Sequence, residues 1–210
     1  MVRLVLVHGA ATTSRMWDRV LPLLEAWTTC SVTAVERPRT GTLDREVAEL
    51  TPLVEGSWLV GASGGATLGL AVAAAGVPLA GAFLHEPAVG SLEPGLLAPV
   101  TTAFVATGTL GLGRTLYGPS WHADMAGSAG DAETGAELAM FQSFEPTRLP
   151  PSAGRVMVTV GSRSPHIRHR SVAALAAAVG CEVGIIDHAS HFAPHDAPAD
   201  FASALVRLLT

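Results

Sequence analysis

The feature that most constrains the fold is a regular alternation of short apolar runs with longer stretches of helical length. The apolar runs have the length of strands and cover residues 3–7, 31–35, 57–60, 80–84, 156–160 and 182–186. The stretches between them place Ala and Leu at helical spacing and cover residues 14–27, 43–54, 65–75, 171–179 and 198–209. This alternation predicts an α/β fold with a mostly parallel sheet of about six strands and helices on both faces.

Composition narrows the choice of class. The chain has 210 residues, of which 49% are hydrophobic and 15% charged, so we expect one well-buried domain over residues 1–210. The formal net charge is −5 and the basic residues, all Arg, are scattered. No basic face for phosphates results, which argues against a nucleic-acid partner and favours a small-molecule substrate. Cys30 and Cys181 match no CxxC spacing, so we expect free thiols and a cytoplasmic protein.

An uncharged stretch over residues 56–84 exceeds the length that normally indicates a membrane span. It contains Ser57, Ser63 and Pro78, however, and divides into strand, glycine turn, helix, turn and strand. A buried parallel strand is also a continuous apolar run. Residues 1–9 form too short an apolar run for a signal peptide and are interpreted as a strand followed by a turn. We therefore expect no membrane partner.

The turns that follow the predicted strands carry most of the chemically reactive side chains. In a parallel α/β sheet, active sites lie at the carboxyl ends of the strands. One such turn, Gly61-Ala62-Ser63-Gly64-Gly65, is a G-x-S-x-G pentad between a strand and a helix. The glycines permit a tight turn that exposes the Ser63 hydroxyl at the start of a helix, where free N–H groups favour a developing negative charge. Ser63 is therefore a candidate nucleophile.

The chain resembles the α/β-hydrolase family, as a compact member similar to serine esterases and lipases. The resemblance rests on four segments in the family's order: "LVLVHGAATTSRMWDRVLPLL", "GASGG", "RVMVTVGS" and "HASHFAPHDAPADFASALVRLL". It implies Ser63 as nucleophile and His191 as general base and acid. It also implies an oxyanion hole made by the backbone N–H groups of Gly64 and Ala10.

The sequence departs from the family pattern in two places. Family members usually begin with an antiparallel strand pair before the His-Gly loop, whereas His8 already stands at that loop here, so we expect a sheet trimmed to about six strands. The usual position of the triad's acid is occupied by Ser164, and a serine cannot stabilise an imidazolium by charge. The family's alternative, an acid after the strand that follows the nucleophile helix, points to Glu86. Asp187, four residues before His191, is the rival for this role.

Residues 88–150 lie where the family inserts its lid, and we expect a small helical lid there. Residues 100–121 are interpreted as one or two short helices and residues 125–135 as a mobile polar turn. Tyr117, Trp121 and Phe141 are expected to contact an apolar substrate. Further candidates for an apolar pocket in this segment are Phe104, Leu110, Leu112, Met140 and Phe144.

The sequence predicts a serine hydrolase that cleaves a small or medium, largely apolar carboxylic ester or lactone through an acyl-enzyme. We expect no cofactor, and no metal, because His188, His191 and His195 have no helical metal-ligand spacing. Two alternatives stay open. One is a lyase, isomerase or synthase in which His191 transfers protons, and the other is a non-catalytic member that only binds a ligand. The protein is expected to be a monomer or homodimer.

Overall fold

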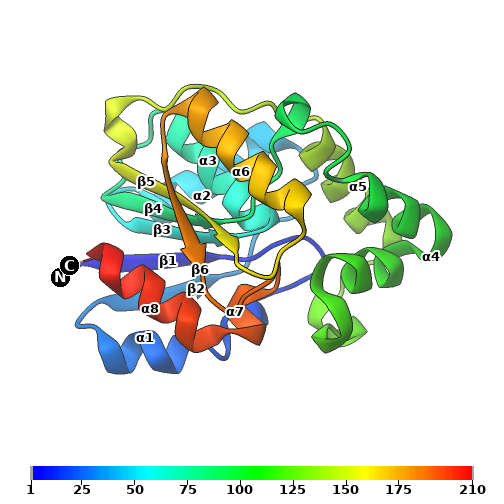
Figure 1. Ribbon diagram of the computed structural model, residues 1–210, viewed down its shortest axis with the longest axis horizontal. Helices are drawn as coiled ribbons and strands as arrows, with labels where there is room; N and C mark the ends of the chain where they lie inside the picture. The colour runs from blue at the N-terminus through cyan, green and yellow to red at the C-terminus, as the bar shows by residue number, and fades with distance from the viewer. Residues whose placement is uncertain (1, 210) are drawn as a thin grey trace.

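In a computed structural model that describes residues 2–209, six strands form one parallel sheet in the order β2-β1-β3-β4-β5-β6 (Figure 1). The strands are β1 (Arg3–Val7), β2 (Ser31–Val35), β3 (Trp58–Ala62), β4 (Gly81–His85), β5 (Arg155–Gly161) and β6 (Glu182–Ile186). Each neighbouring pair in this order is parallel. The predicted α/β fold with a parallel sheet of about six strands is therefore confirmed.

Helices cover both faces of the sheet within the described residues. They are α1 (Leu21–Trp27), α2 (Leu43–Val54), α3 (Gly64–Ala74), α4 (Ala98–Tyr117), α5 (Asp131–Gln142), α6 (His166–Val179), α7 (Ala193–Asp196) and α8 (Pro198–Leu209). Helices α1 and α8 pack together on one face, and α2, α3 and α6 cover the other (Figure 1). Helices α4 and α5 lie beyond one end of the sheet, where the inserted segment 88–150 places them.

The strand register brings the carboxyl ends of the strands to one edge. Val7 pairs with Gly61, Ala62 with His85, and Gly161 with Ile186. The turns that follow β1, β3, β4, β5 and β6 therefore start side by side. Helices α4 and α5 lie over this edge (Figure 1).

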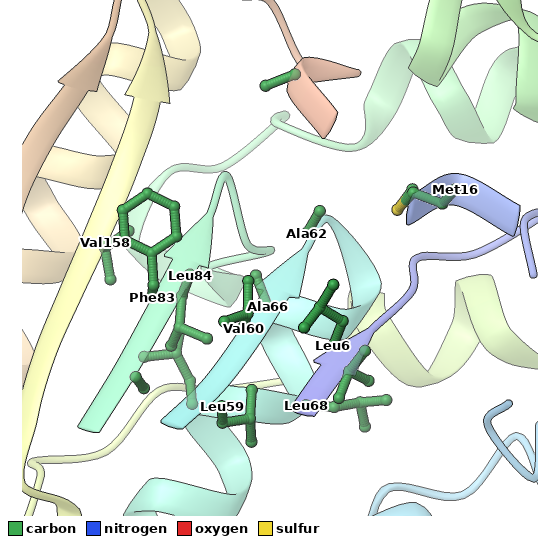
Figure 2. Packing of buried hydrophobic residues seen from close by; sticks show 14 of the residues in the cluster. Leu6, Met16, Leu59, Val60, Ala62, Ala66, Leu68, Phe83, Leu84 and Val158 are labelled. Carbon is green, nitrogen blue, oxygen red and sulfur yellow. The ribbon is translucent and has the colours of Figure 1, made fainter. Parts of the chain in front are cut away.

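Buried apolar side chains on both faces of the central strands explain their stability. All five residues of β4 are buried, as expected for a strand sandwiched between helices. Figure 2 shows Leu6, Leu59, Val60, Phe83 and Leu84 among the residues that pack together in this core. Buried apolar area of this kind is the main favourable contribution to folding.

Several element boundaries differ from those expected. The stretch 14–27 is two elements, a 3-10 turn (Ser14–Trp17) and the short helix α1. Helix α6 begins at His166 and not at Ser171. The interpretation of 125–135 as a polar turn is wrong in its second half, because α5 begins at Asp131. Asp131 accepts hydrogen bonds from the backbone and hydroxyl of Thr109, both at 2.8 Å, and this long-range contact is invisible in the local sequence.

The inserted segment contains one long helix with a break. Helix α4 has non-helical backbone at Thr107 and Gly108, which fits the expectation of one or two helices over 100–121. The uncharged stretch 56–84 is strand β3, helix α3 and strand β4. Among the described residues, no helix combines the length and the apolar character that crossing a bilayer requires.

Candidate active site

Ser63 stands at the turn between β3 and α3. Its backbone angles, φ 56° and ψ −123°, fall in a region that side-chain-bearing residues rarely adopt. The turn is held by a hydrogen bond from the Ser63 N–H to the carbonyl of His85 at 2.8 Å. A Cβ at Gly61 would lie 2.5 Å from the Gly65 carbonyl oxygen, and one at Gly65 would lie 2.0 Å from that of Val7. Both glycines are therefore required by space, as expected for a strand-to-helix elbow.

His191 comes from the loop between β6 and α7. Its Nε2 lies 3.0 Å from the Ser63 hydroxyl oxygen, within reach of proton transfer. The imidazole is 7% exposed, and the ring of Tyr117 stacks on it at 5.6 Å between centroids. The structure thus brings Ser63 and His191 together across 128 residues of sequence.

Glu86 follows β4 and reaches the other nitrogen of the same imidazole. Its Oε2 lies 2.8 Å from His191 Nδ1, so Nδ1–H donates to the carboxylate. Like Ser63, Glu86 has left-handed backbone, with φ 48°, which costs about 1 kcal/mol or more for a residue with a side chain. Asp187, the rival acid, is exposed after the end of β6. The geometry therefore selects Glu86 as the partner of His191.

Three further groups hold the Glu86 carboxylate. Its Oε1 accepts hydrogen bonds from the Gly161 N–H at 2.9 Å and from the Ser164 hydroxyl. Its Oε2 lies 3.1 Å from Nε of Arg168. Ser164, which occupies the family's usual acid position, is thus a hydrogen-bond donor to the acid that replaces it. The carboxylate is completely buried and its oxygens are hydrogen-bonded or ion-paired, which fixes its orientation.

Burial and charge set the protonation states of this chain of groups. Burial has the largest influence on the pKa of His191 and lowers it. The Arg168 guanidinium lowers it further, and the hydrogen bond that His191 donates to Glu86 opposes both effects, so that the pKa is about 4. Burial alone would raise the pKa of Glu86, but the hydrogen bond with His191 and nearby positive charge hold it below its usual range. At neutral pH the site therefore contains a neutral imidazole and an ionised carboxylate.

Gly64 and Ala10, the two expected oxyanion donors, line the same cavity as Ser63. Gly64 is the first residue of α3, so its N–H has no acceptor within the helix. The Ala10 nitrogen, in the loop after β1, lies 3.1 Å from where a Cβ of Gly64 would stand. Two backbone donors on one side of a hydroxyl are the arrangement that stabilises a tetrahedral oxyanion.

A narrow cavity of about 30 Å³ adjoins Ser63, His191, Glu86 and Arg168. Its remaining walls are mostly apolar and come from Ala10, Gly64, Thr67, Ala88, Leu97, Val100, Leu112, Leu116, Leu138 and Phe141. Leu97 and Phe141 also line a wider groove of about 440 Å³ that runs along the start of α4. Phe141 therefore stands between the cavity and the groove.

Only one of the three expected substrate contacts lines the cavity, and it is Phe141. Tyr117 is buried with its ring against His191, and its hydroxyl donates to the Ala10 carbonyl at 2.7 Å. Trp121 is also buried, and its Nε1–H donates to the Ala11 carbonyl at 2.8 Å. Both aromatic residues brace the loop that carries Ala10. Of the other pocket candidates, Leu112 lines the cavity and Leu110 is exposed.

His188 and His195, the two other histidines near His191 in sequence, have partners of their own. His188 is exposed beside Asp200, and the ring of His195 stacks on Phe192. Within residues 2–209, no group of three His, Cys, Asp or Glu side chains is arranged to hold a metal ion. Cys30 and Cys181 are free thiols of intermediate exposure.

Sequence reasoning missed two arginines that lie near the site. Arg37 follows β2, and the rule that strand ends carry functional groups could have indicated it. Arg168 lies in the first turn of α6, and nothing in the sequence distinguishes it from the exposed Arg170 two residues later. Burial of Arg168 follows from packing against Glu86, which is 82 positions away in the chain. No local pattern reports such a contact.

Comparison with known proteins places these features in a family. The model of the alpha/beta hydrolase family matches residues 4–204. No curated protein matches the chain. Many solved structures do match, at low sequence identity.

Three solved structures illustrate the similarity. A bromoperoxidase from Bacillus anthracis is 16% identical, with 99% of this chain and 91% of that chain covered and a TM-score of 0.80. An enol-lactonase from Burkholderia xenovorans LB400 is 16% identical, with 99% and 91% covered and a TM-score of 0.76. A carboxylesterase structure from Nitrososphaera gargenis is 17% identical, with 99% and 89% covered and a TM-score of 0.73. At these identities the likeness concerns the fold.

Proposed function

The chain belongs to the alpha/beta hydrolase family, and from this premise we propose that it is a serine hydrolase that cleaves a carboxylic ester or lactone through an acyl-enzyme. The observation that carries the proposal is the unbroken hydrogen-bonded chain from Ser63 through His191 to Glu86. A serine hydroxyl is a weak nucleophile until a base accepts its proton. Nε2 of a neutral His191 is that base.

For each step of ester hydrolysis, the site contains a residue that can carry it out. Ser63 Oγ attacks the carbonyl carbon of the substrate while its proton passes to His191 Nε2, and Glu86 stabilises the imidazolium that results. The N–H groups of Gly64 and Ala10 stabilise the tetrahedral oxyanion, an effect of about 3 to 4 kcal/mol for each donor. The imidazolium returns the proton to the leaving alkoxide. His191 then deprotonates a water molecule that attacks the acyl-enzyme. As the bond between the acyl carbon and Ser63 Oγ breaks, the imidazolium returns this proton to Oγ, and the acid and free Ser63 result.

The size and the walls of the cavity favour a substrate with a small, largely apolar acyl group. Its walls are formed by side chains such as Leu112, Leu138 and Phe141. Its volume of about 30 Å³ leaves little room for a long chain unless Phe141 moves. The wider groove on the other side of Phe141 can accommodate a larger part of a medium-sized substrate.

A fluorophosphonate probe and a panel of short and medium acyl esters test the proposal. The parent protein is expected to be labelled at Ser63 and to hydrolyse short esters. Ser63→Ala and His191→Ala are each expected to lower kcat by about 10⁴-fold or more. Asp187→Asn, an exposed change close to His191 in sequence, serves as the matched control and keeps full activity.

Two results would count against this function. A folded parent that neither labels nor hydrolyses any ester points to the binding-only alternative. A parent that labels at Ser63 but turns over no ester points to the lyase, isomerase or synthase alternative, in which His191 moves protons on another substrate.

A further inference from the structure

The loop after β1 is held by side chains at four successive carbonyl groups, and three of the four donors are buried while Arg39 is partly exposed. The donors are Arg37 to Gly9 at 3.2 Å, Tyr117 to Ala10 at 2.7 Å, Trp121 to Ala11 at 2.8 Å and Arg39 to Thr12 at 2.7 Å. Two of these donors follow β2, and the other two belong to the inserted segment 88–150. The conformation of the loop is therefore fixed by side chains from other parts of the chain.

The Gly9 carbonyl has a special position among the four, because it shares a peptide unit with the Ala10 N–H. A peptide unit is planar, so whatever fixes the carbonyl oxygen also fixes the direction of the N–H. Besides Arg37, the Gly9 oxygen accepts from the Thr12 hydroxyl at 2.9 Å and lies 3.0 Å from His8 Nδ1. His8 Nε2 accepts from the Arg37 N–H at 3.2 Å, which leaves the ring proton on Nδ1 as a third donor.

Arg37 is held in turn by two carboxylates. Its guanidinium is buried and pairs with Glu46 of α2 at 3.2 Å and with Glu137 of α5. Arg39 lies 3.7 Å from the same Glu137. Two cations and two anions thus form one cluster, in which Arg37, Glu46 and Glu137 are completely buried and Arg39 is 12% exposed. Because α5 belongs to the inserted segment, this cluster joins that segment directly to the Gly9–Ala10 peptide.

Stability alone does not account for this cluster. A buried ion pair usually adds little or nothing compared with apolar side chains of similar volume. Among the described residues, Nε of Arg37 and Oε2 of Glu137 are buried without a hydrogen-bond partner. An apolar replacement could not place a positive charge against the Gly9 carbonyl. Hydrogen bonds in a chain polarise one another, so a cation on the carbonyl makes the Ala10 N–H a stronger donor.

We propose that Arg37 is a positioning residue for the oxyanion hole, and that its ion pair with Glu137 makes the position of the Ala10 N–H depend on the inserted segment. The inference rests on the proposed serine hydrolase function. It adds a link that the triad does not contain: α5 contributes to catalysis through Arg37 and the Gly9–Ala10 peptide.

Arg37→Lys and Glu137→Gln, alone and combined, test the link. A lysine keeps the charge but cannot bridge Glu46, Glu137 and the Gly9 carbonyl as the forked guanidinium does. For Arg37→Lys, kcat per fluorophosphonate-titrated site is expected to fall by about 10- to 100-fold, with KM within about twofold. Glu137→Gln acts in the same direction, and the double variant loses little more than Arg37→Lys, since both changes break one chain of contacts.

Two further measurements separate positioning from a general structural role. An alkyl boronic acid forms a tetrahedral adduct with Ser63, and its affinity should fall by the same factor as kcat. Hydrogen exchange at residues 8–12 should rise. Arg155→Lys changes the exposed Arg155–Glu182 pair at the start of β5 and is the matched control, with all readouts unchanged. A lower Tm with unchanged kcat per titrated site and unchanged boronate affinity would overturn the inference.

Hydrogen exchange also distinguishes this inference from the proposed function. Unchanged exchange at residues 8–12 in Arg37→Lys overturns the inference, even if the parent is an active hydrolase. An inactive parent whose residues 8–12 lose protection in Arg37→Lys overturns the proposed function and leaves the structural link between Arg37 and the loop supported.

Discussion

Two buried carboxylates, Glu86 and Glu137, lie on opposite sides of the chemistry proposed for Ser63. Both side chains are completely inaccessible to solvent. Glu86 stands on the sheet edge, and its oxygens meet His191, the Gly161 N–H, Ser164 and Arg168. Glu137 stands on α5 in the inserted segment. Its Oε1 meets Arg37 and Arg39, and its buried Oε2 has no hydrogen-bond partner among residues 2–209.

The different surroundings of Glu86 and Glu137 correspond to two tasks of such a hydrolase, which are proton transfer and stabilisation of the oxyanion. The proton-transfer side, built around Glu86, is fixed mainly by turns at neighbouring strand ends, with the ring of Tyr117 from the inserted segment stacked on its imidazole. The oxyanion side, built around the Gly9–Ala10 peptide, depends on contacts between the sheet and the inserted segment. Changes in the inserted segment are therefore expected to weaken the stabilisation of the oxyanion more than they change proton transfer by His191.

The largest effect is expected from Glu86→Gln on the proton-transfer side. The variant keeps the size of the side chain but removes the charge that stabilises the His191 imidazolium. We expect kcat for a short ester to fall by about 10⁴-fold, as in other triads that lose their acid. Steady-state kinetics on protein of verified fold measures the loss. Activity within about tenfold of the parent would mean that Glu86 is not the acid of the triad.

The same variant sharpens the comparison between the two sides. Hydrogen exchange at residues 8–12 should stay at the parent level in Glu86→Gln, because among the described residues the hydrogen bonds and ion pairs of Glu86 are made outside that loop. Increased exchange there would show that the two sides are one cooperative unit and would end the distinction.

A smaller effect is expected from Tyr117→Phe, because Tyr117 contacts both sides. Its ring stacks on His191 and its hydroxyl donates to the Ala10 carbonyl. Phenylalanine keeps the ring and leaves a buried carbonyl without this donor, which costs about 1 to 3 kcal/mol of stability. We expect kcat to fall by about tenfold through a displaced Ala10 N–H, with no change in the pH dependence. A shift of the pH profile instead would assign the main role of Tyr117 to the imidazole.

From the sequence, the family resemblance predicted Ser63, His191 and Glu86 and also the oxyanion donors Gly64 and Ala10, but not the contacts that hold the Ala10 loop. Ser63 stands in a pentad between strand and helix, and His191 and Glu86 follow strands, so a parallel sheet necessarily brings them to one edge. The sequence left Glu86 and Asp187 as alternatives because both follow strands. Their choice depends on side-chain direction and burial, which the order of residues does not contain.

The inserted segment illustrates why the rest could not be predicted. Tyr117 and Trp121 were expected to contact substrate because large apolar side chains in a lid commonly do so. Both carry a hydrogen-bond donor, however, and buried donors need acceptors. They find them in the carbonyls of Ala10 and Ala11. The pairing of Glu137 with Arg37 across 100 positions is equally non-local.

The smallest of these effects, and the one that separates the sides by pH, is expected from Arg168→Met. His191 must be neutral to accept the Ser63 proton, and its pKa of about 4 places the acid limb of kcat/KM near that pH. Arg168 is one cause of the lowered pKa, so its removal raises the pKa and moves the limb to higher pH. A shift of about one unit lowers kcat/KM by about threefold at pH 4.5 and leaves it unchanged at pH 8. Arg170→Met, an exposed change on the same helix, is the control.

Because Arg37 acts on the oxyanion and not on the base, Arg37→Lys should lower kcat equally at both pH values. A limb that moves in Arg37→Lys, or stays in place in Arg168→Met, would contradict the division of the site into two separately supported halves.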